Sequence, residues 1–336
     1  MVRGDALQEY ALWRPGKPDG VGDLHRGRVL ARSPGLGGAF VALADAEGFL
    51  PDTEGAADVS VGTLLGVRIT RAAQAGKGPR LTARLTERDA TLATDGPVRL
   101  IRRGPSPLQA IQARYPDAAL QEHRGIAGAP TRFDPDLEDQ IAALGEPETP
   151  LPGGGRLRID VTPALTAIDL DAGSASDDRR GKSVSQAAFN RAALPELARQ
   201  VRLRNLSGAI LVDFAGLSPR RRAALEPDLR AALSTDPLRP RLLGFTHLGL
   251  AEIVRPRIHP PLHELRTSPH AAGLAALLQL AETRPGRAVL RAAPSIVVAL
   301  QEDTVALRDI AEQCGQSLRL LPDPAMRGWR LEEPGG

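Results

Sequence analysis

LTAIDLDAGS (residues 165–174) and GAILVDFAGL (residues 208–217) each carry an apolar, strand-like run to an acidic residue. Side chains two apart on a strand point the same way, so Asp169 and Asp171 share one face. Asp213 closes the second run, which is apolar enough for a strand covered on both faces. We therefore expect three carboxylates to converge, with a hard divalent cation such as Mg2+ relieving their mutual repulsion.

Residues 184–203, between the two stretches, carry a broad apolar stripe at helical spacing. Pro195 interrupts this pattern, so we expect a kink or two helices. The order strand, helix, strand predicts a right-handed crossover between parallel strands. Such a crossover brings Asp213 to the carboxyl edge of a sheet, where α/β folds bind ligands.

The 336 residues carry a formal net charge of +3 and a pI of about 9.5. This excess fits a polyanionic partner, but many soluble proteins share it. Cys314 is the only cysteine, which excludes an intramolecular disulfide and a cysteine-based zinc site within one chain. The N-terminus lacks an apolar leader, and no run reaches the roughly 18 apolar residues that span a bilayer. We expect a cytoplasmic protein with no membrane partner.

From residue 21 to residue 85 the chain consists of short apolar runs cut by glycines, a pattern that predicts a small closed β-barrel. The six Phe, two Trp and two Tyr are too few for an extensive base-stacking platform. From residue 271 the pattern predicts a small α/β module. Its expected elements are a helix, the strand-like runs AVLRAA (288–293) and SIVVAL (295–300), and a helix that stops at Gly315.

Several phrases together resemble the ribonuclease E/G family of endoribonucleases. Those of the catalytic core are ALTAIDLDAGS (164–174), ARQVRLRNLSG (198–208) and ILVDF (210–214), in the family's order and spacing. Those of the barrel are PGLGGAFV (34–41), GFLP (48–51) and GKGPRLT (76–82).

The resemblance implies a multidomain α/β (α+β) fold. It consists of an OB-type RNA-binding barrel inserted in an RNase-H-like scaffold, then an α/β nuclease core and a small C-terminal α/β module. The implied divisions are a scaffold at residues 1–20 and 96–150, the barrel at 21–85, a catalytic domain at 151–257, a proline- and histidine-rich linker at 258–270 and the C-terminal domain at 271–332.

The resemblance also implies Mg2+-dependent endonucleolytic cleavage of single-stranded RNA in processing or decay. Asp169 and Asp213 match the family's metal-holding pair, although an Asp at a strand end can also simply cap the following turn. The family has an amide at the position of Asp171. An aspartate there would act as a third metal ligand, or it would repel the scissile phosphate by about 4 kcal/mol at 4 Å and an effective dielectric of about 20.

Candidate RNA contacts come from both parts of the chain. In the family, the residues matched by Phe40, Phe49 and Lys77 face RNA, whereas a Phe in an alternating strand is otherwise a common core residue. Arg202 and Arg204 precede the catalytic strand and are candidates for binding phosphates beside the metal. The alternative is a helix terminus that favours cations at its negative dipole end.

Three family features are missing from this chain. The 5′-phosphate-sensing segment has no counterpart between residues 85 and 96, so we expect no monophosphate sensor. Gly216 stands where an acid usually follows the catalytic strand. The CPxC pair that supplies a shared zinc link is absent from residues 255–270, where only histidines remain, so a homodimer would form without a shared zinc.

Two rival functions fit the same sequence. In one, the barrel binds RNA and the altered site is inactive, so the protein is a non-catalytic RNA-binding protein. In the other, the chain is a regulatory partner of a full-length ribonuclease, uses its C-terminal module for assembly and needs no metal.

Overall fold

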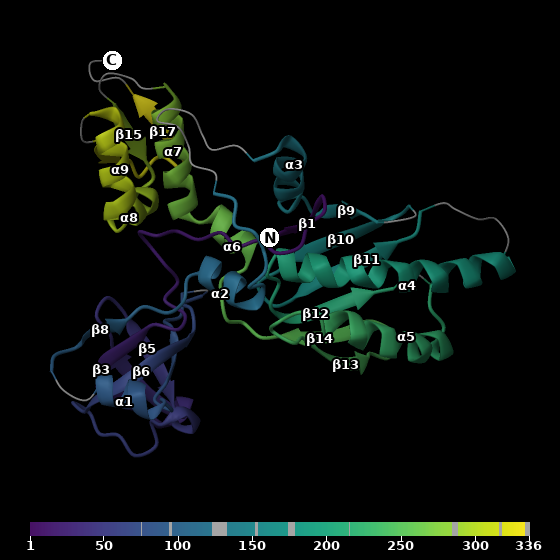
Figure 1. Cartoon of the computed structure of the whole chain (residues 1–336), viewed down its shortest axis with the longest axis horizontal. Coiled ribbons are helices and arrows are strands. Elements are labelled where there is room, and N and C mark those ends of the chain that lie inside the picture. The colour runs from purple at the N-terminus through teal and green to yellow at the C-terminus, as the bar shows by residue number, and fades with distance from the viewer. Residues whose placement is uncertain are drawn as a thin grey trace.

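The computed structural model shows a mixed α/β protein with three groups of elements, a β-barrel, a central sheet with two long helices, and a C-terminal module (Figure 1). No described helix is both long and apolar enough to cross a membrane. The structure describes residues 1–74, 76–93, 96–122, 133–151, 154–173, 179–214, 216–283, 288–315 and 318–332, with the backbone alone for 179–185.

The barrel closes through five strands in the order β3-β4-β5-β7-β6, with β3 pairing to both β4 and β6. The β5–β7 pair is parallel and the other pairs are antiparallel. Val29, Val41, Leu50, Val67 and Leu81 fill the interior. The glycine-cut strands therefore close as predicted. Their bounds are β3 Leu24–Ser33, β4 Gly38–Ala42, β5 Glu47–Pro51, β6 Leu64–Arg71 and β7 Arg80–Thr82.

Elements beside the barrel extend it toward the rest of the chain. Strand β8 pairs with residues 24–26 of β3, before the stretch of β3 that pairs with β4. The short helices follow barrel strands or precede β8. These elements are η1 Pro34–Leu36, η2 Asp52–Glu54, α1 Glu87–Leu92 and β8 Arg99–Arg102.

The central sheet has six strands in the order β13-β14-β12-β11-β10-β9. Only β11 and β12 are parallel neighbours among these pairs, and helix α4 connects them, so the predicted crossover is present. The bounds are β9 Glu148–Pro150, β10 Arg156–Val161, β11 Thr166–Asp171, α4 Arg179–Leu203, β12 Gly208–Asp213, α5 Pro219–Leu233, β13 Arg241–Phe245 and β14 Ala251–Arg255.

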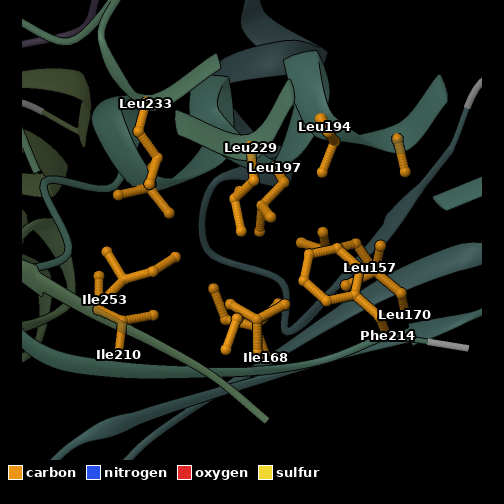
Figure 2. Packing of buried hydrophobic residues seen from close by; sticks show 14 of the residues in the cluster. Leu157, Ile168, Leu170, Leu194, Leu197, Ile210, Phe214, Leu229, Leu233 and Ile253 are labelled. Carbon is orange, nitrogen blue, oxygen red and sulfur yellow. The ribbon is translucent and has the colours of Figure 1, made fainter. Parts of the chain in front are cut away.

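Helices α4 and α5 cover one face of this sheet. Figure 2 shows Leu194 and Leu197 of α4 packed above Ile168 and Ile210 of the strands. The opposite face is open, which differs from the expectation that β12 is covered on both sides. Ala209 is exposed and Leu211 half-buried, whereas Ile210 and Val212 are buried. An apolar run of four residues could not reveal this, because alanine is tolerated on an open face.

We expected a kink or two helices at Pro195; helix α4 runs through Pro195 as one element, so the second of these alternatives is wrong. Proline removes one backbone hydrogen bond and costs a helix about 3 kcal/mol. Ala193, Leu194, Leu197 and Val201 surround it and bury their side chains in the sheet's core, which offsets that cost.

The N-terminal residues tie the segment before the central sheet to helix α4. Leu7, Leu144, Leu203 and Leu262 form one buried cluster, packed against partly buried side chains of the N-terminal segment and α3. Residues 258–270, expected as a linker, contain helix α6 and the start of α7. The bounds are β1 Val2–Arg3, β2 Ala6–Leu7, α2 Pro107–Arg114, α3 Pro135–Ala143 and α6 Leu262–Thr267.

The C-terminal module packs three helices on a three-stranded sheet of order β16-β15-β17. The run SIVVAL forms helix α8 and not the expected strand. Pro294 opens this helix with a preset φ, and Ile296, Val297 and Leu300 share its buried side, so packing overrides the β-preference of the branched residues. The bounds are α7 Pro269–Thr283, β15 Val289–Ala292, α8 Pro294–Gln301, α9 Thr304–Cys314, β16 Arg319–Pro322 and β17 Trp329–Glu332.

Candidate active site

Asp169 and Asp213 are paired in register across the parallel strands β11 and β12. Asp213 is the last residue of its strand, and both side chains are exposed on the open face of the sheet. Neighbouring strands lie about 4.8 Å apart, so the two carboxylates project side by side. The crossover through α4 thus brings together two acids that are 44 positions apart in the sequence.

The electrostatics of the pair show crowding of negative charge. Partial burial raises the pKa of Asp169, and the carboxylates of Asp213 and Asp171 raise that pKa further. Arg156 and Arg158 act in the opposite direction. The site therefore holds more negative charge than its own arginines compensate, which is the condition that a cation would relieve.

A row of charged residues crosses the open face at this level. Arg158 of β10 lies opposite Asp169 on one side and Glu148 of β9 on the other. Asp213 of β12 completes the row, which crosses strands β9 to β12 in the order Glu148, Arg158, Asp169 and Asp213. The arginine is about half exposed and forms ion pairs with Asp160 at 3.0 Å and Glu148 at 3.4 Å.

Asp171 lies two residues further along β11 and pairs in register with Arg156. A guanidinium nitrogen of Arg156 lies 3.0 Å from a carboxylate oxygen of Asp171. Among the described residues, no three His, Cys, Asp or Glu side chains gather as a metal site. The arrangement differs from the expected three-carboxylate cluster, because a guanidinium already neutralises the third acid.

Glycines fix the backbone around these acids. Gly155 has φ +82, and a Cβ there would lie 2.5 Å from the carbonyl oxygen of Asp171. Gly216 has φ +55, and its Cβ would lie 2.5 Å from the side chain of Gln186 on α4. An acidic residue at Gly216 would require both a strained backbone and a displaced glutamine.

Arg204 is not at the carboxyl edge. It precedes β12, whose first residue, Gly208, already lies about 16 Å along the strand from Asp213. It is 6% exposed and donates to the carbonyl of Glu146 at 2.6 Å, Oγ1 of Thr149 at 3.1 Å and Oε1 of Gln200 at 2.9 Å. The prediction that Arg204 binds phosphate beside the metal is wrong, because its guanidinium is enclosed and bonded within the fold.

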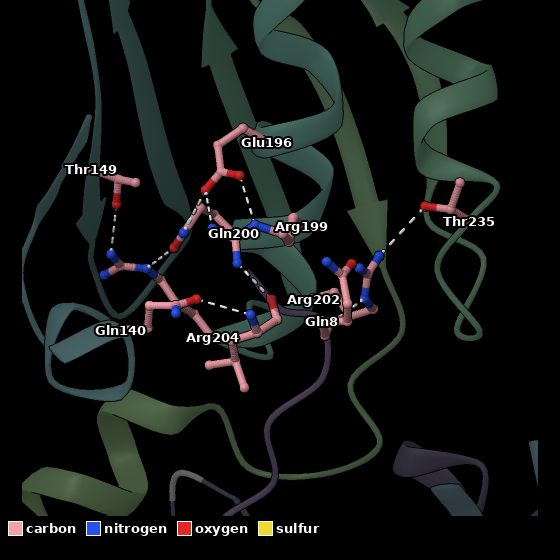
Figure 3. Close-up of polar contacts among 10 residues, drawn as sticks. Gln8, Gln140, Thr149, Glu196, Arg199, Gln200, Arg202, Arg204 and Thr235 are labelled. Atoms are coloured by element: carbon pink, nitrogen blue, oxygen red, sulfur yellow. Dashed lines mark hydrogen bonds and ion pairs between the residues drawn. The ribbon is translucent and has the colours of Figure 1, made fainter. Parts of the chain in front are cut away.

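Arg202 lies at the same far end of the sheet and is partly exposed. It donates to the backbone carbonyl of Gln8 at 3.2 Å and lies 3.5 Å from Oγ1 of Thr235 (Figure 3). Arg199, at the same end, donates hydrogen bonds to the carboxylate of Glu196 and to the backbone carbonyl of Leu7. These arginines fasten the N-terminal segment to α4, so Arg202 cannot act beside Asp213.

The barrel presents the other candidate residues together. Phe40 and Phe49 are in-register neighbours on β4 and β5, half-buried, with ring centroids 5.5 Å apart in an edge-on arrangement. Lys77 is exposed in a turn closed by backbone hydrogen bonds with Gln74, and this turn borders a 460 Å³ pocket. The backbone amide of Phe49 donates to the carbonyl of Pro79 at 2.8 Å, so the turn lies beside the aromatic pair.

The three histidines of the segment 255–270 lie in different surroundings. His259 pairs with Asp19 at 2.6 Å, while burial lowers the pKa of His263. His270 is buried, with Nε2 2.8 Å from Asp303, the N-cap residue of α9, and Nδ1 3.2 Å from Arg14. His270 therefore joins the C-terminal module to the N-terminal segment.

Residues 120–258 match the model of a family described as the Ribonuclease E/G family. Through this segment the chain is similar to the ribonuclease E/G family. Ribonuclease E of Escherichia coli is 40% identical over 131 residues, which are 38% of this chain and 12% of that protein.

Two further relatives give the same result. Ribonuclease E of Synechocystis is 36% identical over 173 residues, 50% of this chain and 25% of that protein. Ribonuclease G of Salmonella typhimurium is 37% identical over 126 residues, 36% of this chain and 25% of that protein. The chain thus spans a quarter or less of these three ribonucleases.

Arg156 and Arg158 are the site residues that sequence reasoning missed. The signal was present in RLRID (156–160), where charged and apolar residues alternate as on a half-open strand. What the sequence did not contain is the register, which sets these arginines opposite Asp171 and Asp169.

Proposed function

We propose that this chain is a metal-dependent endoribonuclease that cleaves single-stranded RNA in processing or decay. The observation that carries this proposal is the in-register pair Asp169 and Asp213 at the end of two parallel strands, exposed to solvent. The match to ribonucleases E and G supports the substrate class. Two rival proposals, an RNA-binding protein without activity and a regulatory partner of a full-length ribonuclease, become outcomes of the test below.

The residues at the site suit a magnesium ion held by two carboxylates. Mg2+ is bound in many phosphoryl-transfer sites by one or two carboxylates, with waters and substrate phosphate completing its shell. The pKa of Asp169 is raised first by partial burial and then by the carboxylates of Asp213 and Asp171, and a divalent cation would remove this second, repulsive part. In this proposal Asp169 and Asp213 hold the ion, and Asp171, bonded to Arg156, is not a ligand.

When bound, the ion supplies positive charge at the phosphoryl oxygens and Lewis acidity at the reacting water. The carboxylates of Asp169 and Asp213 fix the position of that charge, because rigid strands hold both side chains. The water oxygen bonds to phosphorus, the P–O3′ bond breaks, and O3′ takes up a proton. The products are a 3′-hydroxyl and a 5′-phosphate.

The barrel supplies RNA affinity in this proposal. A half-exposed aromatic pair, Phe40 and Phe49, offers rings on which bases stack, a contact worth about 1–3 kcal/mol per base. Lys77 adds a positive charge beside them, and its exposure leaves it free to contact phosphate.

We extend the proposal to the organisation of the chain. The barrel is OB-type, and residues 1–20 with 96–150 form a reduced RNase-H-like scaffold around it. Contacts of Glu9 with Arg114 and Tyr115 support the joining of these two segments. The catalytic domain is residues 151–257, the linker 258–270 and the C-terminal domain 271–332. The protein acts in the cytoplasm, and any homodimer forms without a shared zinc.

Purified protein and a labelled single-stranded RNA test the function directly. Cleavage is expected in Mg2+ and not in EDTA. Asp169→Asn and Asp213→Asn should each abolish it while RNA affinity stays within a few-fold, and the double variant controls for contaminating nuclease. RNA binding without cleavage by the unaltered protein would favour the non-catalytic alternative. Absence of both would favour the regulatory partner.

A further inference from the structure

The open face of strands β9 to β12 carries five carboxylates, and its arginines both come from β10. The acids are Glu148, Asp160, Asp169, Asp171 and Asp213, and the bases are Arg156 and Arg158. An RNA backbone laid across this face meets an excess of negative charge. The two arginines are the protein cations on these four strands that can offset it.

Both arginines are held in pairs that a phosphate can replace. Their side chains are 55% and 51% exposed, and their partners are 42% to 52% exposed. Ion pairs of this kind contribute about 0–1 kcal/mol, because water competes for both partners. A guanidinium offers five donors in a planar fork, which matches phosphate oxygens.

The two positions along β10 differ in what they face. Arg158 lies opposite Asp169 and next to Glu148, in the row that contains the carboxylate pair. Arg156 lies opposite Asp171 and bonds it at 3.0 Å. Arg158 therefore lies in the row of the Asp169–Asp213 pair, and Arg156 neutralises Asp171, which lies two residues further along β11.

We propose that β10 supplies two positioning residues to the nuclease site: Arg158 binds a backbone phosphate beside the Asp169–Asp213 pair, and Arg156 neutralises Asp171. This inference rests on the proposed function. It also explains how the site tolerates Asp171: an aspartate paired with a guanidinium forms a neutral pair, which does not repel the scissile phosphate. The substrate contact belongs to Arg158, which exchanges Glu148 and Asp160 for phosphate.

RNA affinity tests the part of Arg158 independently of cleavage. Affinity for a fluorescent single-stranded RNA is measured on an Asp169→Asn background across a range of salt concentrations. Arg158→Gln should weaken binding about 5- to 10-fold and reduce the slope of log K against log salt by about 0.7, the value for one phosphate contact on a single strand. Arg158→Lys should retain the slope with an intermediate affinity. Arg308→Gln, which removes an exposed arginine of the C-terminal module, should change neither quantity.

Kinetics test the part of Arg156 through a double-mutant cycle. Arg156→Gln should lower kcat/KM about tenfold in the presence of Asp171 and less than about twofold in an Asp171→Asn background. An equal loss in both backgrounds would overturn the neutralising part, and unchanged affinity and salt slope in Arg158→Gln would overturn the phosphate contact. If the unaltered protein does not cleave RNA, the proposed function fails, while the affinity series still decides whether Arg158 binds phosphate.

Discussion

The two ends of the central sheet hold their charged side chains in opposite ways. At the carboxyl end, Asp169 and Asp213 stand exposed next to each other, and the pKa of Asp169 is raised. At the other end, Arg204 is 6% exposed and donates to the backbone carbonyl of Glu146. It also donates to the side-chain oxygens of Gln200 and Thr149 (Figure 3). Exposed carboxylates that repel one another indicate a binding site for a ligand. A buried guanidinium whose donors are hydrogen-bonded within the protein instead stabilises the fold.

The comparison matters because both ends carry phrases typical of ribonucleases E and G. The phrase around Asp169 contributes groups that face solvent, and the phrase around Arg204 contributes groups that join α4 to the N-terminal and preceding segments. A shared motif therefore identifies the family without saying which of its residues meet the substrate.

The largest effect on stability is expected at the arginine end. Arg204→Met should lower the free energy of unfolding by about 3 kcal/mol, because several buried oxygens lose a charged donor. Asp213→Asn should change it by less than about 0.5 kcal/mol, since an exposed acid on an open face supports little of the fold. Urea titrations of both variants measure the difference, and equal losses would remove the distinction between the two ends.

A metal effect of intermediate size is expected at the acid end alone. At a Mg2+ concentration ten times the dissociation constant, the folded protein should gain about 1.4 kcal/mol. Calorimetric unfolding with and without Mg2+ detects this as a higher Tm. Arg202→Gln should keep the increase and Asp169→Asn should lose it. A Tm increase that survives in Asp169→Asn would place the bound ion elsewhere.

A smaller effect is expected when the chemical group at the 5′ end of the RNA is changed. Because we expect this chain to have no 5′-monophosphate sensor, RNAs with a 5′-monophosphate and a 5′-hydroxyl should be cut at rates within about threefold. That limit corresponds to roughly 0.6 kcal/mol of transition-state binding. Competition between the two RNAs in one reaction measures the ratio directly. A preference of tenfold or more would mean that another part of the chain binds the terminus.

The smallest effect is a pH dependence at Asp169. Its pKa is raised in the folded protein, first by partial burial and then by Asp213 and Asp171, so ionisation opposes folding. This destabilisation is full above the folded pKa and disappears as the pH falls below the unfolded value of about 3.9. Asp169→Asn should therefore be slightly more stable than the original protein at pH 7, by less than about 0.5 kcal/mol, and equal to it near pH 3. An advantage that grows on acidification would reverse the sign.

The sequence predicted the elements whose signals are local. The two apolar runs ending in acids, the glycine-cut barrel and the helix stopped by Gly315 all follow from patterns within a few residues. Gly315 has φ +69, a conformation that glycine adopts without strain.

The remaining features depend on tertiary contacts. Burial of Arg204 could not be inferred, because an arginine before a strand looks the same whether it meets RNA or a carbonyl. The neutralisation of Asp171 depends on cross-strand register with Arg156, which local sequence does not encode. Helix α8 was missed because Ile296 and Val297 favour strands until a packed neighbour and Pro294 decide otherwise.

The central claim is that the carboxyl end of the sheet performs chemistry and the opposite end does not. It is tested most directly by the cleavage rate of one single-stranded RNA in Mg2+ by Asp213→Asn and Arg202→Gln, each compared with the original protein. We predict a loss of about a thousandfold for Asp213→Asn, equivalent to about 4 kcal/mol of transition-state stabilisation, and a change within about threefold for Arg202→Gln. Retained activity in Asp213→Asn, or an equal loss in a folded Arg202→Gln, would contradict the account.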